Sequence, residues 1–216
     1  MSTRTPTAKR RAARPSASSA AAVAAETARP DRKQAILLAP EKLFAQHGYH
    51  AVTIRQIAEE AGVPLALVGY YHGQKHELFH AIFEHWAPSI QARLAGLAAV
   101  KLDPDDARTL PRIIEAFTTP VLALRASPEG EYYALLVARE LANTTEEADR
   151  VLRAYFDPLA EAFIDALQVV LPHATRGEVA WGYQFALGAL MNHLNSSRIA
   201  RLSRGQNTPG DPAAAP

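Results

Sequence analysis

The residues whose types and spacing best suit binding of another molecule lie between positions 53 and 75. This stretch reads Thr-Ile-Arg-Gln-Ile-Ala-Glu-Glu-Ala-Gly-Val-Pro-Leu-Ala-Leu-Val-Gly-Tyr-Tyr-His-Gly-Gln-Lys. It predicts two short helices, 54–60 and 64–71, joined by a tight turn in which Gly62 supplies backbone angles that other residues avoid. A helix-turn-helix of this kind places its second helix in the major groove of DNA. The alternative is a generic helical pair whose adjacent tyrosines belong to the core.

Several side chains of this stretch have the chemistry to contact DNA. Thr53, at a helix start, can bind a phosphate through its hydroxyl and amide, and Lys75 can do so by charge. Arg55 can reach a phosphate or a base edge. The tyrosines offer hydroxyls to phosphates and ring edges to thymine methyl groups. The candidate DNA-binding residues are Thr53, Arg55, Leu65, Ala66, Gly69, Tyr70, Tyr71 and Lys75.

Three segments together resemble the tetracycline-repressor (TetR) family of transcription regulators. They are Leu43-Phe44-Ala45-Gln46-His47-Gly48-Tyr49, the segment 53–63, and Tyr70-Tyr71-His72-Gly73-Gln74-Lys75. The spacing of all three agrees with the family. Leu65-Ala66-Leu67-Val68 with the following tyrosines is similar to the branch with an L-A-L-V-x-Y-x-x-G-x-K recognition segment. The resemblance implies a DNA-binding domain followed by a helical domain for dimerisation and effector binding.

Four positions depart from the family pattern. Gly69 stands where the family usually has asparagine, His72 where it has phenylalanine, Gln74 where it has serine, and Pro40 where it has alanine. We expect Gly69 to remove a base-contacting side chain and to loosen the second helix. His72 puts a polar ring where the family packs an apolar one. These departures imply that DNA affinity depends more on phosphate contacts than on base contacts.

The apolar spacing elsewhere is helical, without the period-two alternation of strands. A first helix is expected from about Asp31 to His47, where Pro40 forces either a kink or a later start. Another helix begins near Lys75, and Pro88 should bend it or end its first part. Four more helices are expected at 107–126, 129–143, 145–170 and 175–200, with bends near Pro120 and Pro158. The predicted fold class is all-α.

This pattern predicts two helical domains between two disordered ends. A three-helix DNA-binding domain occupies 31–76, and an effector-binding and dimerisation domain occupies 77–203. Residues 1–30 are expected to form a disordered basic arm, and 204–216 a disordered tail, because both are rich in alanine, proline or polar residues. The arm carries six basic residues and one acidic residue, a net charge of 6 − 1 = +5, and therefore favours an anionic partner.

The composition excludes several other classes of protein. Cysteine is absent, so disulfides, thiolate metal sites and cysteine nucleophiles are excluded. No run of 18 apolar residues could span a membrane, and the alanine stretch after Lys9-Arg10-Arg11 is too short for a secretory signal. We therefore expect a cytoplasmic protein with no membrane partner.

The last predicted helix has more apolar surface than one small domain needs. Its apolar and small residues recur at helical spacing and are Trp181, Gly182, Phe185, Leu187, Gly188, Met191 and Leu194. With the 145–170 helix they are expected to form a two-fold four-helix interface in a homodimer. The alternative is that all of them belong to the core of one chain.

A pocket for a small effector is expected between the helix that starts near Lys75 and the next three helices. Its candidate walls are Trp86, Phe117, Tyr132, Tyr133, Leu136 and Phe163, with Arg139 as a possible anchor for an anion. Each could instead be an ordinary core or surface residue. The apolar walls favour a lipophilic effector.

Catalysis and metal binding are not expected. The sequence has no glycine-rich phosphate loop, no G-x-S-x-G motif and no convincing acid–base pair, and it implies no cofactor. His76, His80 and Glu84 share one helix face at metal-binding spacing, but such a face is usually solvated. The predicted function is a DNA-binding transcription regulator, most simply a repressor released from a palindromic operator by the effector. A helical adaptor without DNA binding is the alternative.

Overall fold

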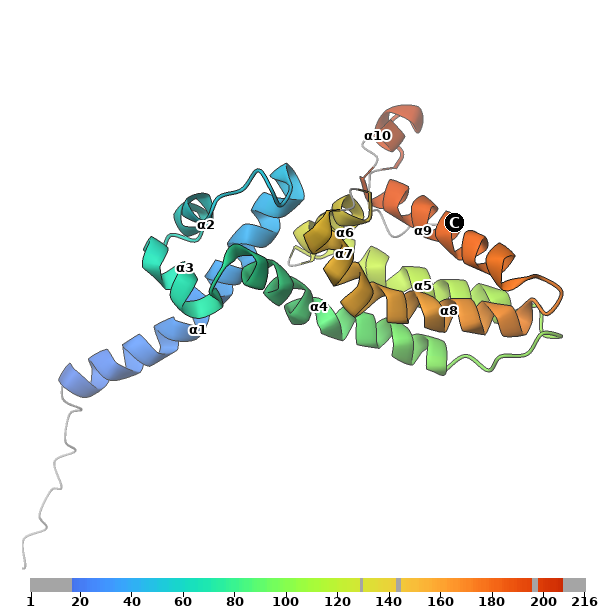
Figure 1. The fold of residues 1–216 in the computed structure, drawn as a ribbon, viewed down its shortest axis with the longest axis horizontal. Helices are drawn as coiled ribbons and strands as arrows, with labels where there is room; N and C mark the ends of the chain where they lie inside the picture. Colours follow the sequence, from blue (N-terminus) through green and yellow to red (C-terminus); the bar gives the residue numbers. More distant parts are fainter. Residues whose placement is uncertain (1–16, 129, 143–144, 196–197, 208–216) are drawn as a thin grey trace, which may run out of the picture.

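The computed structural model describes residues 17–128, 130–142, 145–195 and 198–207, with side chains described from residue 32 onward. Every regular element in these ranges is helical (Figure 1). The elements are α1 (Ala17–His47), α2 (Ile54–Glu60), α3 (Leu65–His72), α4 (Lys75–Ala98), α5 (Thr109–Ala126), α6 (Glu131–Ala142), α7 (Glu146–Val151), the π-helical segment η1 (Leu152–Phe156), α8 (Asp157–Val170), α9 (Arg176–Asn195) and α10 (Arg198–Leu202). The all-α prediction is confirmed.

Helix α1 begins earlier than the sequence suggested. It starts at Ala17 rather than near Asp31, so residues 17–30, expected to be part of a disordered arm, are helical. The reason is that alanine has the highest helix propensity, so an alanine-rich segment can extend a helix although its composition is also typical of disorder. The helix also continues through Pro40. The rest of the expected arm, and the expected tail from residue 208, lie outside the described residues.

The first core cluster joins the helix-turn-helix to the body. Ile36 and Phe44 of α1 are fully buried together with Phe79 and Phe83 of α4. The Phe44 and Phe79 rings meet edge-on, with 5.6 Å between their centroids. The cluster continues into α6 through Leu136, which is also fully buried. Helices α1, α4 and α6 are therefore packed as one unit.

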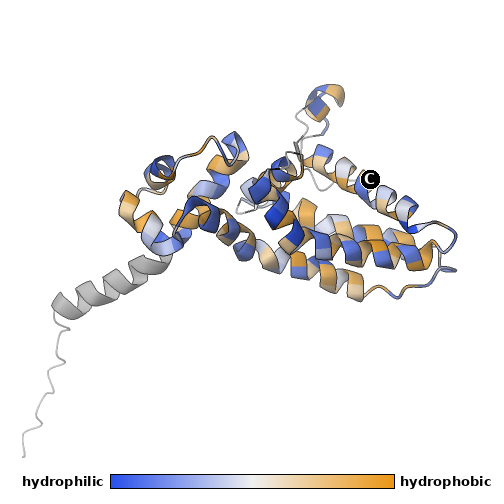
Figure 2. Cartoon of the chain, in the orientation of Figure 1, coloured by the Kyte–Doolittle hydropathy of each residue, from blue (hydrophilic) through white to orange (hydrophobic). Residues whose placement is uncertain are grey.

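The second core cluster holds the four long helices of the body together. Figure 1 shows α5, α8 and α9 alongside the C-terminal half of α4. Phe117 of α5 packs edge-on against Phe163 of α8, at 5.3 Å, and contacts Tyr183 of α9. Figure 2 shows apolar and polar residues alternating around these helices, as expected for helices that bury one face.

The expected 145–170 helix is divided into three parts. Helix α7 passes into η1, in which the amide of Asp157 bonds to the carbonyl of Leu152 five residues earlier. Pro158 follows directly and cannot donate a backbone hydrogen bond, so the regular α-helical ladder is interrupted at this place. By contrast, Pro88 and Pro120 lie inside continuous helices, and Pro88 does not end the first part of α4.

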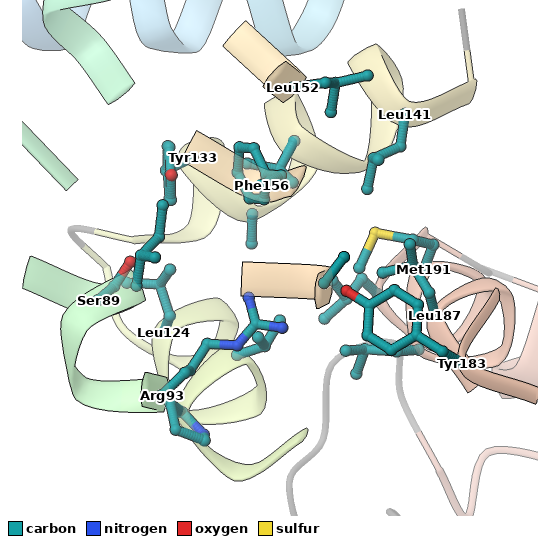
Figure 3. A pocket seen from close by; sticks show the side chains of 18 of the residues that line it. Ser89, Arg93, Leu124, Tyr133, Leu141, Leu152, Phe156, Tyr183, Leu187 and Met191 are labelled. Atoms are coloured by element: carbon teal, nitrogen blue, oxygen red, sulfur yellow. The ribbon is translucent and has the colours of Figure 1, made fainter. Parts of the chain in front are cut away.

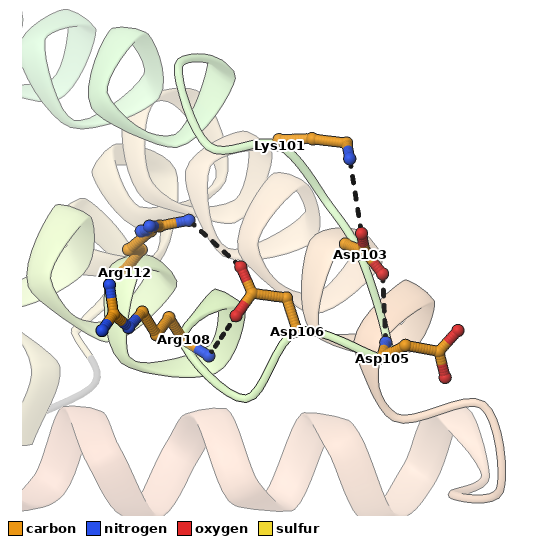
Figure 4. Close-up of polar contacts among 6 residues, drawn as sticks. All are labelled: Lys101, Asp103, Asp105, Asp106, Arg108 and Arg112. Atoms are coloured by element: carbon orange, nitrogen blue, oxygen red, sulfur yellow. Dashed lines mark hydrogen bonds and ion pairs between the residues drawn. The ribbon is translucent and has the colours of Figure 1, made fainter.

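The connection from α4 to α5 is held by short-range polar contacts (Figure 4). Asp103 accepts a hydrogen bond from the amide of Asp105 at 3.1 Å, and Asp106 accepts one from the amide of Arg108 at 2.9 Å. Asp106 also pairs with Arg112 at 3.4 Å. These contacts satisfy amides near the start of α5, where a helix has no partners of its own for them.

Candidate nucleic-acid interface and ligand cavity

The second helix of the helix-turn-helix, α3, has one solvent-facing side. Its exposed residues are Leu65, Ala66, Gly69 and Tyr70. The Tyr70 side chain is 80% exposed, whereas Val68 on the other side is fully buried. Tyr71 is half-buried, and its ring meets that of Tyr70 edge-on at 5.2 Å. The alternative that both tyrosines belong to the core is therefore wrong for Tyr70.

Gly69 leaves a gap on this exposed side of α3. A methyl group added at Gly69 would meet no described atom within 4 Å, so packing inside the chain does not require glycine there. The backbone of Gly69 also lies outside the positive-φ region that favours glycine. The structure therefore leaves Tyr70 as the largest exposed group on this side.

Thr53 is already engaged in a helix cap. Its amide donates to Oε1 of Gln56 at 2.8 Å, and its hydroxyl accepts from the amide of Gln56 at 3.3 Å. This reciprocal capping box fixes the start of α2. Both Thr53 and Gln56 are exposed, so a phosphate could reach the amide only by displacing the Gln56 side chain. Arg55 beside them is exposed as well.

Lys75 points toward the core of the helix-turn-helix. Its Nζ atom lies 4.3 Å from the centroid of the Tyr49 ring, a cation–π geometry. Partial burial of this ammonium lowers its pKa. The expected phosphate contact therefore competes with an internal one, and Lys75 also serves to hold the start of α4 against α1.

His72 fills the place where the family packs an apolar ring. The imidazole is half-buried, and its Nε2 atom is buried without a hydrogen-bond partner among the described residues. Burial, and then the neighbouring charge of Lys33, lower its pKa. The ring is therefore neutral near pH 7 and packs much as an aromatic side chain would, which explains how this departure is accommodated.

A cavity of about 300 Å³ lies in the body between α4, α5, α6, the η1–α8 segment and α9 (Figure 3). It was expected between the first four of these segments, and α9 adds a further wall. Its lining residues include Ser89, Ile90, Arg93, Val121, Leu124, Tyr133, Ala134, Val137, Phe156, Tyr183, Leu187, Leu190 and Met191. This is the lower end of the range for small-molecule sites.

Only one of the seven candidate effector-binding residues, Tyr133, lines this cavity. Phe117 and Phe163 line a separate hollow of about 220 Å³ beside α9, and Tyr132 lines a shallow surface hollow near Lys42. Leu136 is fully buried in the first core cluster. These corrections share one cause: apolar spacing identifies buried side chains but does not show which of them border a void.

Arg139 is not the expected anion anchor of the cavity. Its Nη1 atom lies 3.5 Å from the carbonyl of Gln46, at the C-terminal end of α1. The same guanidinium approaches Gly48, which has a φ of 85° and would bring an added Cβ within 3.0 Å of it. A cation here complements the negative end of the α1 dipole. Arg139 therefore connects α6 to the helix-turn-helix.

Arg93 was missed as a cavity residue. It lies on the buried face of α4, with Ile90 and Leu97 at helical spacing, and it is only 7% exposed. Its position was visible in the sequence as a charged residue inside an apolar stripe, which is unusual enough to mark a site.

A buried carboxyl connects α1 with α4 and α6. Glu41 is 2% exposed and accepts a hydrogen bond from Nε1 of Trp86 at 2.7 Å. It also accepts one from the backbone amide of Tyr133, in the first turn of α6. The Trp86 ring stacks on the Tyr133 ring with 5.2 Å between centroids and 18° between planes. Trp86 thus lies between the helix-turn-helix and a wall of the cavity, without lining the cavity itself.

The described residues contain neither a cluster of metal ligands nor a membrane-spanning helix. His76, His80 and Glu84 do not converge, and no group of three or more potential metal ligands occurs in this part of the chain. No described helix is long and apolar enough to cross a membrane.

Together, an exposed second helix and a cavity inside a helical body define a helix-turn-helix protein with an internal cavity. Residues 36–82 match the family model for bacterial regulatory proteins of the tetR family. Residues 115–215 match the model for the tetracyclin repressor-like C-terminal domain. The chain belongs to the TetR family, as its sequence motifs indicated, and this membership argues against an enzyme.

Curated relatives agree with this assignment. The chain is 33% identical over 103 residues to the transcriptional regulator RutR of Escherichia coli, covering 43% of this chain and 49% of RutR. It is 30% identical over 91 residues to the regulator HbdR of Aromatoleum, covering 42% and 33% of the two chains. The matches thus span between a third and a half of the length of these relatives.

Solved structures share the fold. A proposed fatty acid metabolism regulator of Clostridium perfringens superimposes with a TM-score of 0.60 at 18% identity, over 82% of this chain and 90% of that one. The fatty acid degradation regulator FadR of Bacillus halodurans gives 0.55 at 16% identity, over 83% and 89%. At these identities the likeness concerns the fold.

The Glu41 carboxyl makes stability depend on pH in a defined window. Burial raises its pKa from 4.5 to about 7, although the hydrogen bonds from Trp86 and Tyr133 act in the opposite direction. The unfolded chain therefore releases this proton first as pH rises. Stability from this group is fully present below pH 4.5 and is lost as pH rises through about 7.

We predict that Glu41→Gln removes this pH dependence, because glutamine keeps an acceptor for Trp86 without a charge. From pH 4.5 to about pH 8, the free energy of unfolding of the variant should rise by roughly 3 kcal/mol relative to that of the wild type. Urea unfolding at a series of pH values measures this. Parallel profiles for the two proteins would contradict the assignment.

Proposed function

We propose that the protein is a dimeric DNA-binding transcription regulator that acts as a repressor and is released from a palindromic operator by a small lipophilic effector. The observation that carries this proposal is the exposed side of α3, with Tyr70 at its centre, on a helix-turn-helix that shares its core with a cavity-bearing body. A regulator of this kind acts in the cytoplasm, where its DNA is.

The DNA contact is proposed to combine the residues of one face. Tyr70, with Leu65 and Ala66, would enter the major groove, while Arg55 and the cap residue Thr53 would contact the phosphates on either side. Lys75 would contribute only after leaving the Tyr49 ring. The basic residues before position 17 would add non-specific affinity, because each phosphate contact releases counterions.

The proposed dimer interface uses the outer side of α9. Trp181 is 64% exposed and Phe185 70%, and their rings lie 5.7 Å apart. Two large exposed aromatic rings on one helix favour an interface. Leu187, Met191 and Leu194 of the predicted stripe are not available to a partner, because Leu187 and Met191 line the cavity and Leu194 is buried within the chain. Gly182 and Gly188 of the same stripe are exposed.

The proposed coupling passes from the cavity to the helix-turn-helix through three contacts. Tyr133 lines the cavity and stacks on Trp86, and Trp86 donates to Glu41 on α1. A ligand that displaces the Tyr133 ring would therefore change the contacts by which the body positions α1. In a dimer this changes the separation of the two α3 helices, which must match about one turn of DNA.

We predict that Tyr70→Ala weakens binding to the operator by about tenfold or more while leaving the thermal midpoint unchanged, because this ring contacts DNA rather than the core. Fluorescence anisotropy with DNA from upstream of the gene, at two salt concentrations, measures affinity and salt slope. Leu102→Ala, at another exposed leucine, is the matched control. Equal operator affinity in all three proteins, or the absence of a salt slope, would refute DNA recognition by α3.

We predict that Phe185→Glu converts the dimer to a monomer by placing two charges against each other in the interface. Sedimentation equilibrium should show half the wild-type mass, and operator affinity should fall with it. Leu202→Glu, which changes another exposed apolar residue on α10, should leave the mass unchanged. A wild-type mass for the Phe185 variant would place the interface elsewhere.

We predict that Leu187→Trp, which fills part of the cavity, mimics the effector and lowers operator affinity by about fivefold or more. Combined with Trp86→Phe, which keeps the ring but removes the hydrogen bond to Glu41, its effect should fall below about twofold. Val169→Trp, at an exposed site on α8, is the control for an added indole. An undiminished effect in the double variant would exclude coupling through Trp86.

A further inference from the structure

Arg93 is a buried cation that has no counterion among the described residues. Its side chain lies on the cavity wall, and its Nε atom is buried with no hydrogen-bond partner in the described part of the chain. No described residue forms an ion pair with it. Its guanidinium carbon lies 4.9 Å from the centroid of the Phe117 ring, a contact that offsets only part of the cost of burying a charge.

The other polar groups around Arg93 do not neutralise it. Tyr133 and Tyr183 are the groups that interact with it electrostatically, and both hydroxyls are neutral near pH 7, since an ordinary tyrosine pKa lies near 10 and burial raises the pKa further here. The Tyr133 hydroxyl is itself buried without a partner among the described residues. The one carboxylate among the lining residues, Asp157, is exposed at the start of α8 and is not among the groups that shift the pKa of Arg93.

Apart from Arg93, the two tyrosines, Ser89, Asp157 and Gln184, the residues that line the cavity are apolar. Leucine, methionine and phenylalanine side chains surround the space into which the guanidinium points (Figure 3). These include Leu124, Phe156, Leu187 and Met191. A volume of about 300 Å³ is at the lower end of the range for small-molecule sites, which limits the enclosed ligand to a small molecule.

We propose that the cavity binds a small monocarboxylate with an apolar body, whose carboxylate pairs with Arg93 and accepts a hydrogen bond from Tyr133. The planar guanidinium matches a carboxylate in a bidentate pair, and the apolar walls enclose the rest of the ligand. One unpaired cation matches one negative charge. This inference rests on the proposed function, since it names the chemical class of the effector.

The inference is tested with 3-phenylpropanoate and octanoate, each compared with its neutral primary amide, and with inorganic phosphate as an anion that lacks an apolar body. Binding is followed by isothermal titration calorimetry of the wild-type protein, which leaves both tryptophans in place. At least one acid should bind saturably, roughly tenfold or more tighter than its amide. Phosphate should give no signal.

Arg93→Met supplies the decisive variant. It should weaken binding of the acid by roughly 10- to 100-fold, leave the amide little changed, and raise the thermal midpoint of the free protein, because it removes an uncompensated buried charge. Arg112→Met, at a partly exposed arginine outside the cavity, should bind the acid as the wild type does. Unchanged acid binding in the Arg93 variant, or a lower midpoint, would overturn the assignment.

Two further outcomes separate this inference from the proposed function. If the amides bind as tightly as the acids and release DNA, the cavity is an effector site but the carboxylate assignment is wrong. If neither acid binds up to its solubility limit, the assignment is also wrong, while operator binding by the free protein still decides the proposed function. Operator release by an acid, lost in the Arg93 variant, supports both.

Discussion

The arrangement of this protein depends on a buried carboxyl shared by three helices. Glu41 of α1 is held by the indole of Trp86 in α4 and by the amide of Tyr133 in α6. The helix-turn-helix has no separate core, because its buried apolar residues belong to the same cluster as buried residues of α6. Burying a carboxyl costs free energy unless its oxygens accept hydrogen bonds. Displacement of Trp86 or of the Tyr133 amide would leave a buried oxygen of Glu41 without a hydrogen bond, and a movement of the helices would relieve that cost.

Helix α4 carries the parts of the molecule that must communicate. Its start is capped by the Gln74–Glu77 capping box, and Lys75 in its first turn lies over the Tyr49 ring. Its middle holds Trp86, and its second half brings Arg93 to the cavity. Because Pro88 does not interrupt this helix, the proposed coupling would move it as one rigid element rather than about a hinge.

Features set by local chemistry could be predicted from the sequence, and features set by three-dimensional packing could not. The cap at Thr53 and the positive-φ glycines Gly62 and Gly73 are local signals, and the limits of α2 and α3 follow from them to within one residue. The predicted cavity walls were mostly wrong because a buried side chain such as Leu136 looks the same in sequence whether or not it borders a cavity. Arg93 could have been found, since a charge within an apolar stripe contradicts the periodicity around it.

Helix α9 makes the cavity and the proposed dimer interface two sides of one element. Tyr183 and Leu187 face the cavity, whereas Trp181 and Phe185 face away from it. In the proposed regulator, an effector that fills the cavity would press on the helix that positions the partner subunit, as well as on Tyr133. Two connections would then act on the separation of the recognition helices. Since a dimer binds two half-sites only at one spacing, modest movements at each connection would suffice to release the DNA.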